Sequence, residues 1–282
     1  MWQFFPLITP MQFPVYSERP ANIESVIPPL KEIFSGSGID VVEFNSRDLH
    51  NGILREKDTV GFSLPGIIGE TSSYTDQIGE TGLREMSAAV REGRIMLAIC
   101  AGAYFIARQT IYDPAWGPRK SRAPENYILN AVAHGPVADM GGKYDPAEWP
   151  SDLSLAQVWY KTNNNPNDKE HWKHAAFAYG NGPGLDPDYP DSPELEALAY
   201  YSHAPGKPLA AASLRHGDGK ILLLGALPHI GHREIAPHPG TERIRKLLAD
   251  MKPHEPARQD FMNNIGNRLH SQILTYRQKF FI

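Results

Sequence analysis

The feature that most constrains this chain is a near-continuous apolar run over residues 94–99, which its one cysteine follows directly. Consecutive apolar residues are typical of a parallel strand that is covered on both faces. Cys100 follows directly, and three small residues, 101–103, lead into a helix that we expect to run to about Gln109. A buried strand, a nucleophile on a sharp turn and small flanking residues are what a nucleophile elbow requires. The run therefore predicts an α/β architecture with Cys100 at the end of a buried strand.

Strand and helix patterns alternate on both sides of this run. Strands are predicted at residues 12–17, 39–44, 59–64, 208–215 and 220–225, and helices at 21–34, 80–92, 241–251 and 260–280. Such alternation implies a parallel sheet with helices on both faces. Residues 195–201 suit either a short helix or a strand.

Residues of about 112–192 interrupt the alternation, because they are dense in Pro, Gly, Asn and Asp. A structureless loop of that length would be unusual in a compact domain. We therefore expect a β-rich insertion, with short strands at 155–160 and 175–179. Without a repeat or linker, the chain is predicted to be one domain over 1–282. Its core would span about 12–232, its insertion about 112–192 and a C-terminal helical extension about 241–282.

Composition excludes several function classes. The hydrophobic fraction of 41% supports a packed core, and the net charge of −4 is not that of a dedicated nucleic-acid binder. No run approaches the roughly 18 apolar residues that span a bilayer. The apolar N-terminus lacks a preceding basic residue and is interrupted by Pro6, Pro10 and Pro14, unlike a signal peptide. We therefore expect a cytoplasmic protein with no nucleic-acid or membrane partner.

A single cysteine also excludes an internal disulfide and a multi-cysteine metal site. His171 and His174 have a spacing that suits a metal, but no third ligand is obvious, so neither a metal nor a cofactor is expected. Cys100 is then either a buried structural thiol or a reactive one. The N-terminus of the helix that follows would favour the thiolate.

A reactive thiol needs a general base. His229 is the best-placed histidine, because it follows the strand predicted at 220–225 and the carboxyl ends of parallel strands meet at one edge of a sheet. His232 and His238 lie on the same loop and are the fallback candidates. The backbone N–H of Ala101 would donate to an oxyanion.

Several motifs then occur in order along the chain. They are LPGIIGE at 64–70 with Tyr74 beyond it, ICAGAYF at 99–105, HGPV at 134–137, YGNGPG at 179–184, and closing strands at 208–213 and 219–225. Over roughly residues 12–232 they resemble the N-terminal domain of biotin-protein ligases, a class I glutamine amidotransferase-like module. The resemblance implies a flavodoxin-like three-layer sandwich with a mostly parallel central sheet.

The resemblance also implies a site. In active amidotransferases the elbow cysteine attacks an amide carbonyl, and a His two residues before a Glu acts as base. His229 falls at the His position, but Gly231 stands where the Glu belongs, so Glu234 is the nearest acid that would replace it. A second departure is Ile67, where the family has a glycine in the oxyanion loop. The expected oxyanion and pocket residues are Ala101, Gly102, Gly66, Gly69, Glu70, Tyr74, Tyr104, Asn181 and Gly182.

The function that we expect is a cysteine-dependent amide hydrolase or transferase acting on a small-molecule or amide substrate. The alternative is a catalytically inactive ligand-binding or regulatory module, which the missing Glu allows. A complete biotin ligase is not expected, because residues 233–282 contain no Gly/Arg-rich biotin-adenylate loop. The apolar stripe of the last predicted helix would pack on its own domain or pair two copies into a homo-oligomer. That stripe comprises Phe261, Ile265, Leu269, Ile273, Tyr276 and Phe280.

Overall fold

The computed structural model describes residues 10–68, 72–114, 117–137, 149–162, 171–187, 194–238 and 240–280. The strands are β1 (Met11–Tyr16), β2 (Ile39–Phe44), β3 (Gly61–Leu64), β4 (Ile95–Ile99), β5 (Ala107–Tyr112), β6 (Lys120–Arg122), β7 (Leu129–Gly135), β8 (Ser154–Thr162), β9 (His171–Tyr179), β10 (Gly184–Pro187), β11 (Leu195–Tyr201), β12 (Leu209–His216) and β13 (Gly219–Leu224). The helices are α1 (Ile23–Ile33), α2 (Ser46–His50), α3 (Ser72–Gln77), α4 (Gly79–Arg91), α5 (Ala101–Ile106), α6 (His232–Ile235), α7 (Glu242–Met251) and α8 (Glu255–Phe280), with 3-10 turns η1 (Ile53–Arg55) and η3 (Lys252–His254).

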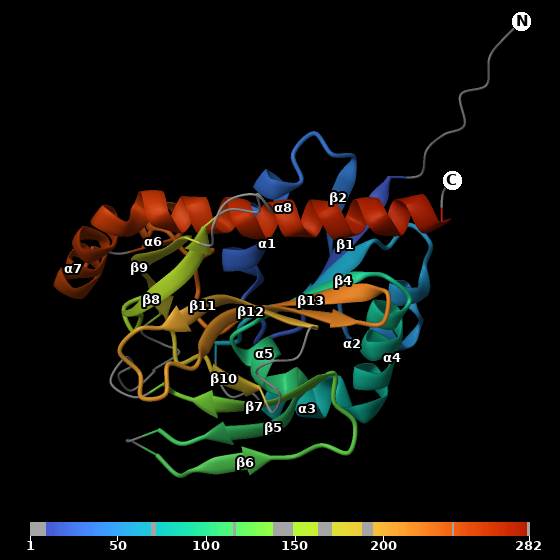
Figure 1. Ribbon diagram of the computed structural model, residues 1–282, viewed down its shortest axis with the longest axis horizontal. Coiled ribbons are helices and arrows are strands. Elements are labelled where there is room, and N and C mark those ends of the chain that lie inside the picture. Colours follow the sequence, from blue (N-terminus) through green and yellow to red (C-terminus); the bar gives the residue numbers. More distant parts are fainter. Residues whose placement is uncertain are drawn as a thin grey trace, which may run out of the picture.

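The parallel half of the sheet has the order β2-β1-β3-β4-β13 (Figure 1). This is the order of flavodoxin-like folds, in which the chain crosses from β2 back to the other side of β1 and sites form at the carboxyl ends of the strands. The predicted fold class is confirmed. Both β4 and β13 end next to the turn that carries Cys100.

The β-rich insertion continues the same sheet through β12, which pairs antiparallel with β13. Beyond β12 the sheet divides into two arms. One arm runs β10-β7-β5-β6, and the other runs β11-β8-β9. The segment 195–201, which the sequence left open between helix and strand, is therefore a strand.

The helix after Cys100 is shorter than the sequence predicts. It ends at Ile106 instead of about Gln109, and β5 begins at Ala107. The reason is that residues 107–112 join a parallel ladder with β7, while the Thr110 hydroxyl donates to the carbonyl of Tyr104 at 2.6 Å. That hydrogen bond satisfies a carbonyl in the last turn of the helix.

Two apolar layers lie on the two faces of the sheet. Along β4, Ile95, Leu97 and Ile99 pack with α1 and α8, whereas Met96 and Ala98 pack with α4 and α5. The alternation is that of a strand covered on both faces, as the sequence predicts. The result is a three-layer sandwich with the elbow at its centre.

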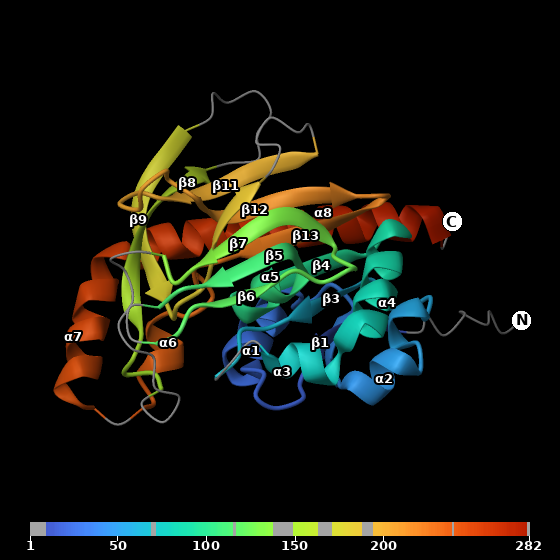
Figure 2. The same cartoon turned by 90° about the horizontal axis from the view of Figure 1, so that it is seen from below.

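Helix α8 runs along one face of the sheet, from the side of β8 and β9 to the parallel strands (Figures 1 and 2). Five residues of its predicted apolar stripe are buried, and only Phe280 is exposed, at 43%; the buried members are Phe261, Ile265, Leu269, Ile273 and Tyr276. The stripe thus packs within the chain, and pairing of two copies through this helix stays a prediction for its outer face. None of the described helices combines the length and the apolar character needed to cross a bilayer.

Candidate active site

Cys100 lies on the sharp turn between β4 and α5. Its backbone has φ 49° and ψ −104°, and its N–H donates to the carbonyl of Leu224 on β13 at 2.7 Å. A non-glycine residue in such a sparsely populated region costs about 1–3 kcal/mol and is typical of functional sites. Gly102 makes the turn possible, because a Cβ there would lie 2.5 Å from the carbonyl oxygen of Leu64.

Backbone segments surround the sulfur of Cys100. The thiol donates to the carbonyl of Gly180 at 3.7 Å. A Cβ at Gly66 would lie 3.9 Å from the sulfur, and one at Gly182 would lie 3.5 Å from it and 1.9 Å from the carbonyl oxygen of Gly225. A side chain at Gly182 would therefore separate β13 from the 180–183 loop, whereas a Cβ at Gly66 would meet Cys100 at ordinary contact distance. Cys100 itself is 8% exposed.

Buried tyrosines hold the loops around the sulfur. Tyr104 donates its hydroxyl to the carbonyl of Asn181 at 3.1 Å, and Tyr179 donates to that of Gly182 at 2.8 Å. Tyr201 donates to the carbonyl of Pro183 at 3.2 Å. Three consecutive carbonyls of one loop are thus anchored, and Asn181, the first of these residues, takes a left-handed φ of 64°.

Two other family motifs pack against the same elements. Tyr74 is fully buried and donates to the carbonyl of Pro65 at 2.9 Å, next to Gly66. Val137 donates its N–H to the Tyr179 hydroxyl at 2.7 Å. The sequence motifs are therefore grouped in space around the elbow. Gly69 and Glu70 lie outside the described residues.

Burial determines the ionisation of Cys100. It raises the pKa of the thiol to about 12, and the hydrogen bond from the Ala101 N–H opposes only part of that rise. The lowered pKa that the sequence suggests does not result, because the sulfur is shielded from water. At neutral pH the thiol is protonated.

His229 follows β13 and is 4% exposed. Its Nε2 lies 3.5 Å from the Ser25 hydroxyl of α1, and its Nδ1 has no hydrogen-bond partner in the described part of the chain. Burial, with a smaller contribution from Arg258, lowers the pKa of the imidazole to about 3. Among the described residues, the Cys100 thiol and the His229 ring have different hydrogen-bond partners and no hydrogen bond joins them, so their pairing stays a prediction. Of the fallback candidates, His232 is exposed at the start of α6 and His238 is half-buried.

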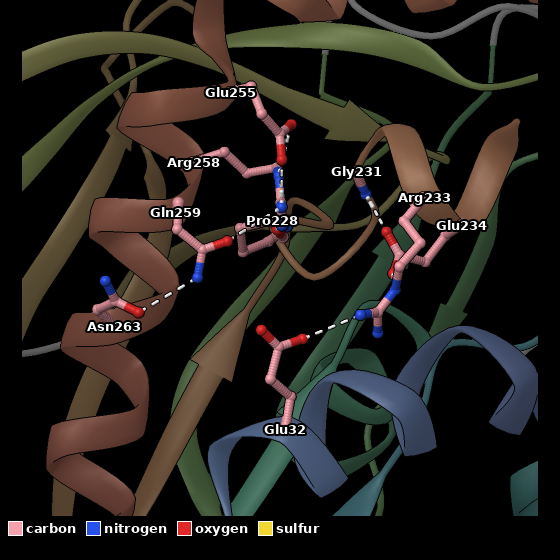
Figure 3. Close-up of polar contacts among 9 residues, drawn as sticks. All are labelled: Glu32, Pro228, Gly231, Arg233, Glu234, Glu255, Arg258, Gln259 and Asn263. Carbon is pink, nitrogen blue, oxygen red and sulfur yellow. Dashed lines mark hydrogen bonds and ion pairs between the residues drawn. The ribbon is translucent and has the colours of Figure 1, made fainter.

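The expected acid, Glu234, is bonded elsewhere. Its carboxylate accepts from the Gly231 N–H at 2.8 Å and from Arg233 at 3.3 Å, and so caps α6 (Figure 3). The place beside Gly231 is occupied by Arg258, because a Cβ at Gly231 would lie 2.7 Å from Cζ of that guanidinium. Arg258 is held there by Glu255 and by the carbonyl of Pro228, to which it donates at 2.9 Å.

Sequence reasoning missed Arg258, Ser25 and Tyr201. Arg258 and Ser25 sit in ordinary helical patterns, and Tyr201 sits in a segment whose structure was open, so no local signal marked them. The described residues contain no cluster of three or more His, Cys, Asp or Glu side chains that could hold a metal ion. His174 is described on β9, but the side chain of His171 is outside the described part.

Comparison with known proteins agrees with this architecture. A family model described as "Biotin-protein ligase, N terminal" matches residues 39–279. An uncharacterized protein of Chlamydia muridarum is 27% identical over 265 residues, which cover 93% of this chain and 96% of that protein. A crystal structure of a glutamine amidotransferase from Thermotoga maritima aligns with a TM-score of 0.54 at 10% identity, over 94% of this chain and 99% of that one. This chain therefore belongs to the biotin-protein ligase N-terminal family and has a class I glutamine amidotransferase-like fold.

Proposed function

We propose that this protein is a glutamine amidotransferase-like ligand-binding module that keeps the nucleophile elbow and does not hydrolyse glutamine. Glutaminase chemistry in this fold would need a thiolate, an imidazole that accepts its proton and an acid that orients the imidazole. The observation that carries the proposal is the replacement of the acid. Gly231 stands at its position, and the Arg258 guanidinium fills the adjoining space.

Arg258 changes the electrostatics as well as the shape of the site. A carboxylate beside His229 would stabilise the imidazolium that forms when the base takes a proton. A guanidinium destabilises it, and burial, with a smaller contribution from this guanidinium, lowers the pKa of His229 to about 3. The thiol of Cys100, with a pKa of about 12, is neutral as well. Proton transfer from the thiol to the ring is therefore unfavourable at neutral pH.

The elbow remains suited to holding a small polar molecule. The N–H of Ala101 is directed at the sulfur, and the Gly180 carbonyl, on a loop that three tyrosines hold, accepts from the thiol. This N–H and this carbonyl are preorganised hydrogen-bond partners for an amide or acyl group. Binding there without turnover is the role that these contacts support.

A second candidate is a cysteine-dependent hydrolase for another amide, ester or thioester. The strained backbone of Cys100, with φ 49°, favours it, because such strain is typical of active sites. The thiol would then be activated by the substrate complex, in which hydrogen bonds often tighten.

The test compares the protein with Cys100→Ser, with circular dichroism to show that both are folded. Ammonia release from glutamine should be the same for the two proteins and equal to the background. Glutamine should nevertheless slow alkylation of Cys100 at alkaline pH, since a bound ligand would cover the sulfur. Ammonia release that depends on Cys100 would overturn the proposal. A Cys100-dependent burst with p-nitrophenyl acetate, without ammonia release, would favour the second candidate.

A further inference from the structure

A cleft of about 440 Å³ lies between the last turns of α8 and the turn that joins β12 to β13. We call it the α8–β13 cleft. It is lined by Gly93, two residues before β4, and by Gly219, the first residue of β13. Cys100 follows the other end of β4. The length of a buried strand therefore separates this cleft from the elbow.

The cleft is basic, although the chain as a whole has a net charge of −4. Its lining contains the cations of Arg215, Lys220 and Lys279, and a single carboxylate, that of Asp218. Asp218 is paired with Lys279 at 2.7 Å, and this ammonium, with a smaller effect of Arg215, lowers the pKa of that carboxyl. Arg215 donates its Nε–H to the carbonyl of Gly217 at 3.1 Å, which uses one of its five donors. Three positive charges against one negative charge leave two uncompensated in the cleft.

The register of the sheet brings two of these cations together. Arg215 and Lys220 are direct partners in the ladder between β12 and β13. Residues in such a pair point to the same face of the sheet, with Cβ atoms about 4.5–5.5 Å apart, and like charges there repel each other. The face is the one that α8 covers, because Leu222, two residues beyond Lys220, packs in the same apolar layer as Tyr276. An anion bound between the two side chains would replace their repulsion by two attractions.

We propose that the α8–β13 cleft binds a small phosphate monoester, whose phosphate group accepts hydrogen bonds from Arg215 and Lys220. Such a group carries close to two negative charges above neutral pH, which matches the two uncompensated cations. It carries them on one centre, which two neighbouring side chains can reach together, and guanidinium and ammonium groups both suit it. The volume is within the range of small-molecule sites and leaves room for the organic part beside Thr275 and Tyr276. This inference does not depend on the function proposed for the elbow, since it uses no property of Cys100.

The experiment is isothermal titration calorimetry of the full chain at about pH 8, where a phosphate monoester is a dianion. The probes are glycerol 3-phosphate and inorganic phosphate, and sodium acetate is the singly charged control. Glycerol 3-phosphate should bind saturably, and its affinity should fall as sodium chloride is added, because salt screens exposed charges. Acetate should give no saturable heat. No saturable heat with glycerol 3-phosphate, or binding of inorganic phosphate that is as tight or tighter, would overturn the assignment to a phosphate monoester.

Substitutions locate the bound anion. Lys220→Gln should raise the Kd for glycerol 3-phosphate about 10-fold or more, as the loss of a charge-assisted hydrogen bond does. Lys31→Gln removes the same charge from an exposed position of α1 outside the cleft and should change the Kd by less than about 2-fold, because distant exposed charges are screened. Circular dichroism shows that the variants are folded, and Arg215→Gln replaces Lys220→Gln should that variant not fold.

A third substitution acts in the opposite direction. Asp218→Asn removes the one carboxylate of the cleft and releases Lys279 from its ion pair, so the Kd for glycerol 3-phosphate should fall. Equal effects of Lys220→Gln and Lys31→Gln, or a Kd that Asp218→Asn does not lower, would each overturn the proposal.

Discussion

At the scale of single residues, two features of Cys100 act in opposite directions on its reactivity. The turn presents the sulfur at the carboxyl end of β4, with the Ala101 N–H directed at it. Burial nevertheless removes the water that would stabilise a thiolate. The second effect is the larger, so the geometry of a nucleophile is present while its charged form is not.

Alkylation of Cys100 by iodoacetamide should therefore be slow at neutral pH. Because the pKa is about 12, the thiolate fraction should rise about 10-fold per pH unit between about pH 7 and 9. Mass spectrometry of the intact protein measures the rate. N-acetylcysteine in the same tube is the control, and its rate should level off above its ordinary pKa. A plateau for Cys100 near neutral pH would contradict this prediction.

Gly231 and Arg258 form the second residue-scale pair. Gly231 has an extended backbone, with φ −122°, so any cost of a side chain there comes from contact and not from the backbone. Gly231→Ala should lower the free energy of unfolding by about 1 kcal/mol or more, as overpacking does. The loss of unfolding free energy caused by Gly231→Ala should be smaller in a chain that also carries Arg258→Ala.

Denaturant unfolding measures this effect, and Gly240→Ala is its matched control. A Cβ at Gly240 would lie 3.8 Å from its nearest neighbour, an ordinary contact, so that variant should stay within about 0.5 kcal/mol of the parent. Equal losses of unfolding free energy in Gly231→Ala and Gly240→Ala would show that Arg258 does not restrict position 231.

At the scale of elements, α8 combines structural and site roles. Its apolar stripe packs on one face of β4 and β13. In its first turns, Arg258 donates to the carbonyl of Pro228, next to His229. The same helix therefore contributes to the core and determines what lies beside position 231.

Two leucines on α8 provide a matched test of its packing. Leu269 is fully buried and Leu274 is 54% exposed. Leu269→Ala should lower the free energy of unfolding by about 2–5 kcal/mol, because it removes buried methyl groups and leaves a cavity. Leu274→Ala should change it by about 0.5 kcal/mol or less. Similar large losses would mean that the outer face of α8 is covered in solution, as a pairing of two copies requires.

Sequence patterns predicted the elements well where one rule dominates. The near-continuous apolar run 94–99 is the pattern of a strand covered on both faces, and the stripe of α8 has a clear helical period. The end of α5 was missed, because partners on β7, distant in sequence, draw residues 107–112 into a ladder. The two arms beyond β12 were not predictable either, since short strands in a Pro- and Gly-rich segment do not reveal their pairing.

The candidate site was likewise predictable from the sequence only in part. The motifs around Cys100, Gly66, Tyr74 and Gly182 mark positions that the structure brings together. The expected pairing of Cys100 with His229 assumed only that both follow parallel strands. The His229 ring is hydrogen-bonded to Ser25 and the Cys100 thiol to the carbonyl of Gly180, and both partners lie far away in sequence. Arg258 lies on α8, about thirty residues further along the chain, and no pattern near Gly231 predicts the contact between the two residues.

At the scale of the whole molecule, the parallel sheet and its helices bury an imidazole in neutral form. His229 has a pKa of about 3, whereas an unfolded histidine titrates near about 6.5. Below pH 6.5 the unfolded chain binds a proton that the folded chain does not. Protonation of His229 in the unfolded chain therefore does not affect the free energy of unfolding above pH 6.5, and it lowers that free energy progressively as the pH falls toward 3.

The free energy of unfolding should accordingly fall faster with acid in the parent than in His229→Asn. The difference in slope should approach about 1.4 kcal/mol per pH unit between about pH 6 and 4. Urea unfolding at a series of pH values measures it. His50→Asn, at an exposed position of α2, controls for the loss of a histidine as such. Parallel curves for the parent and His229→Asn would contradict the buried neutral ring.

The contact between Gly231 and Arg258 also couples the two positions in any redesign. An acid introduced at position 231 alone would first meet the guanidinium. Removing Arg258 alone would leave Glu255 and the Pro228 carbonyl without their donor. Each single change is therefore disfavoured, and a redesign that places an acid at position 231 has to change both positions at once.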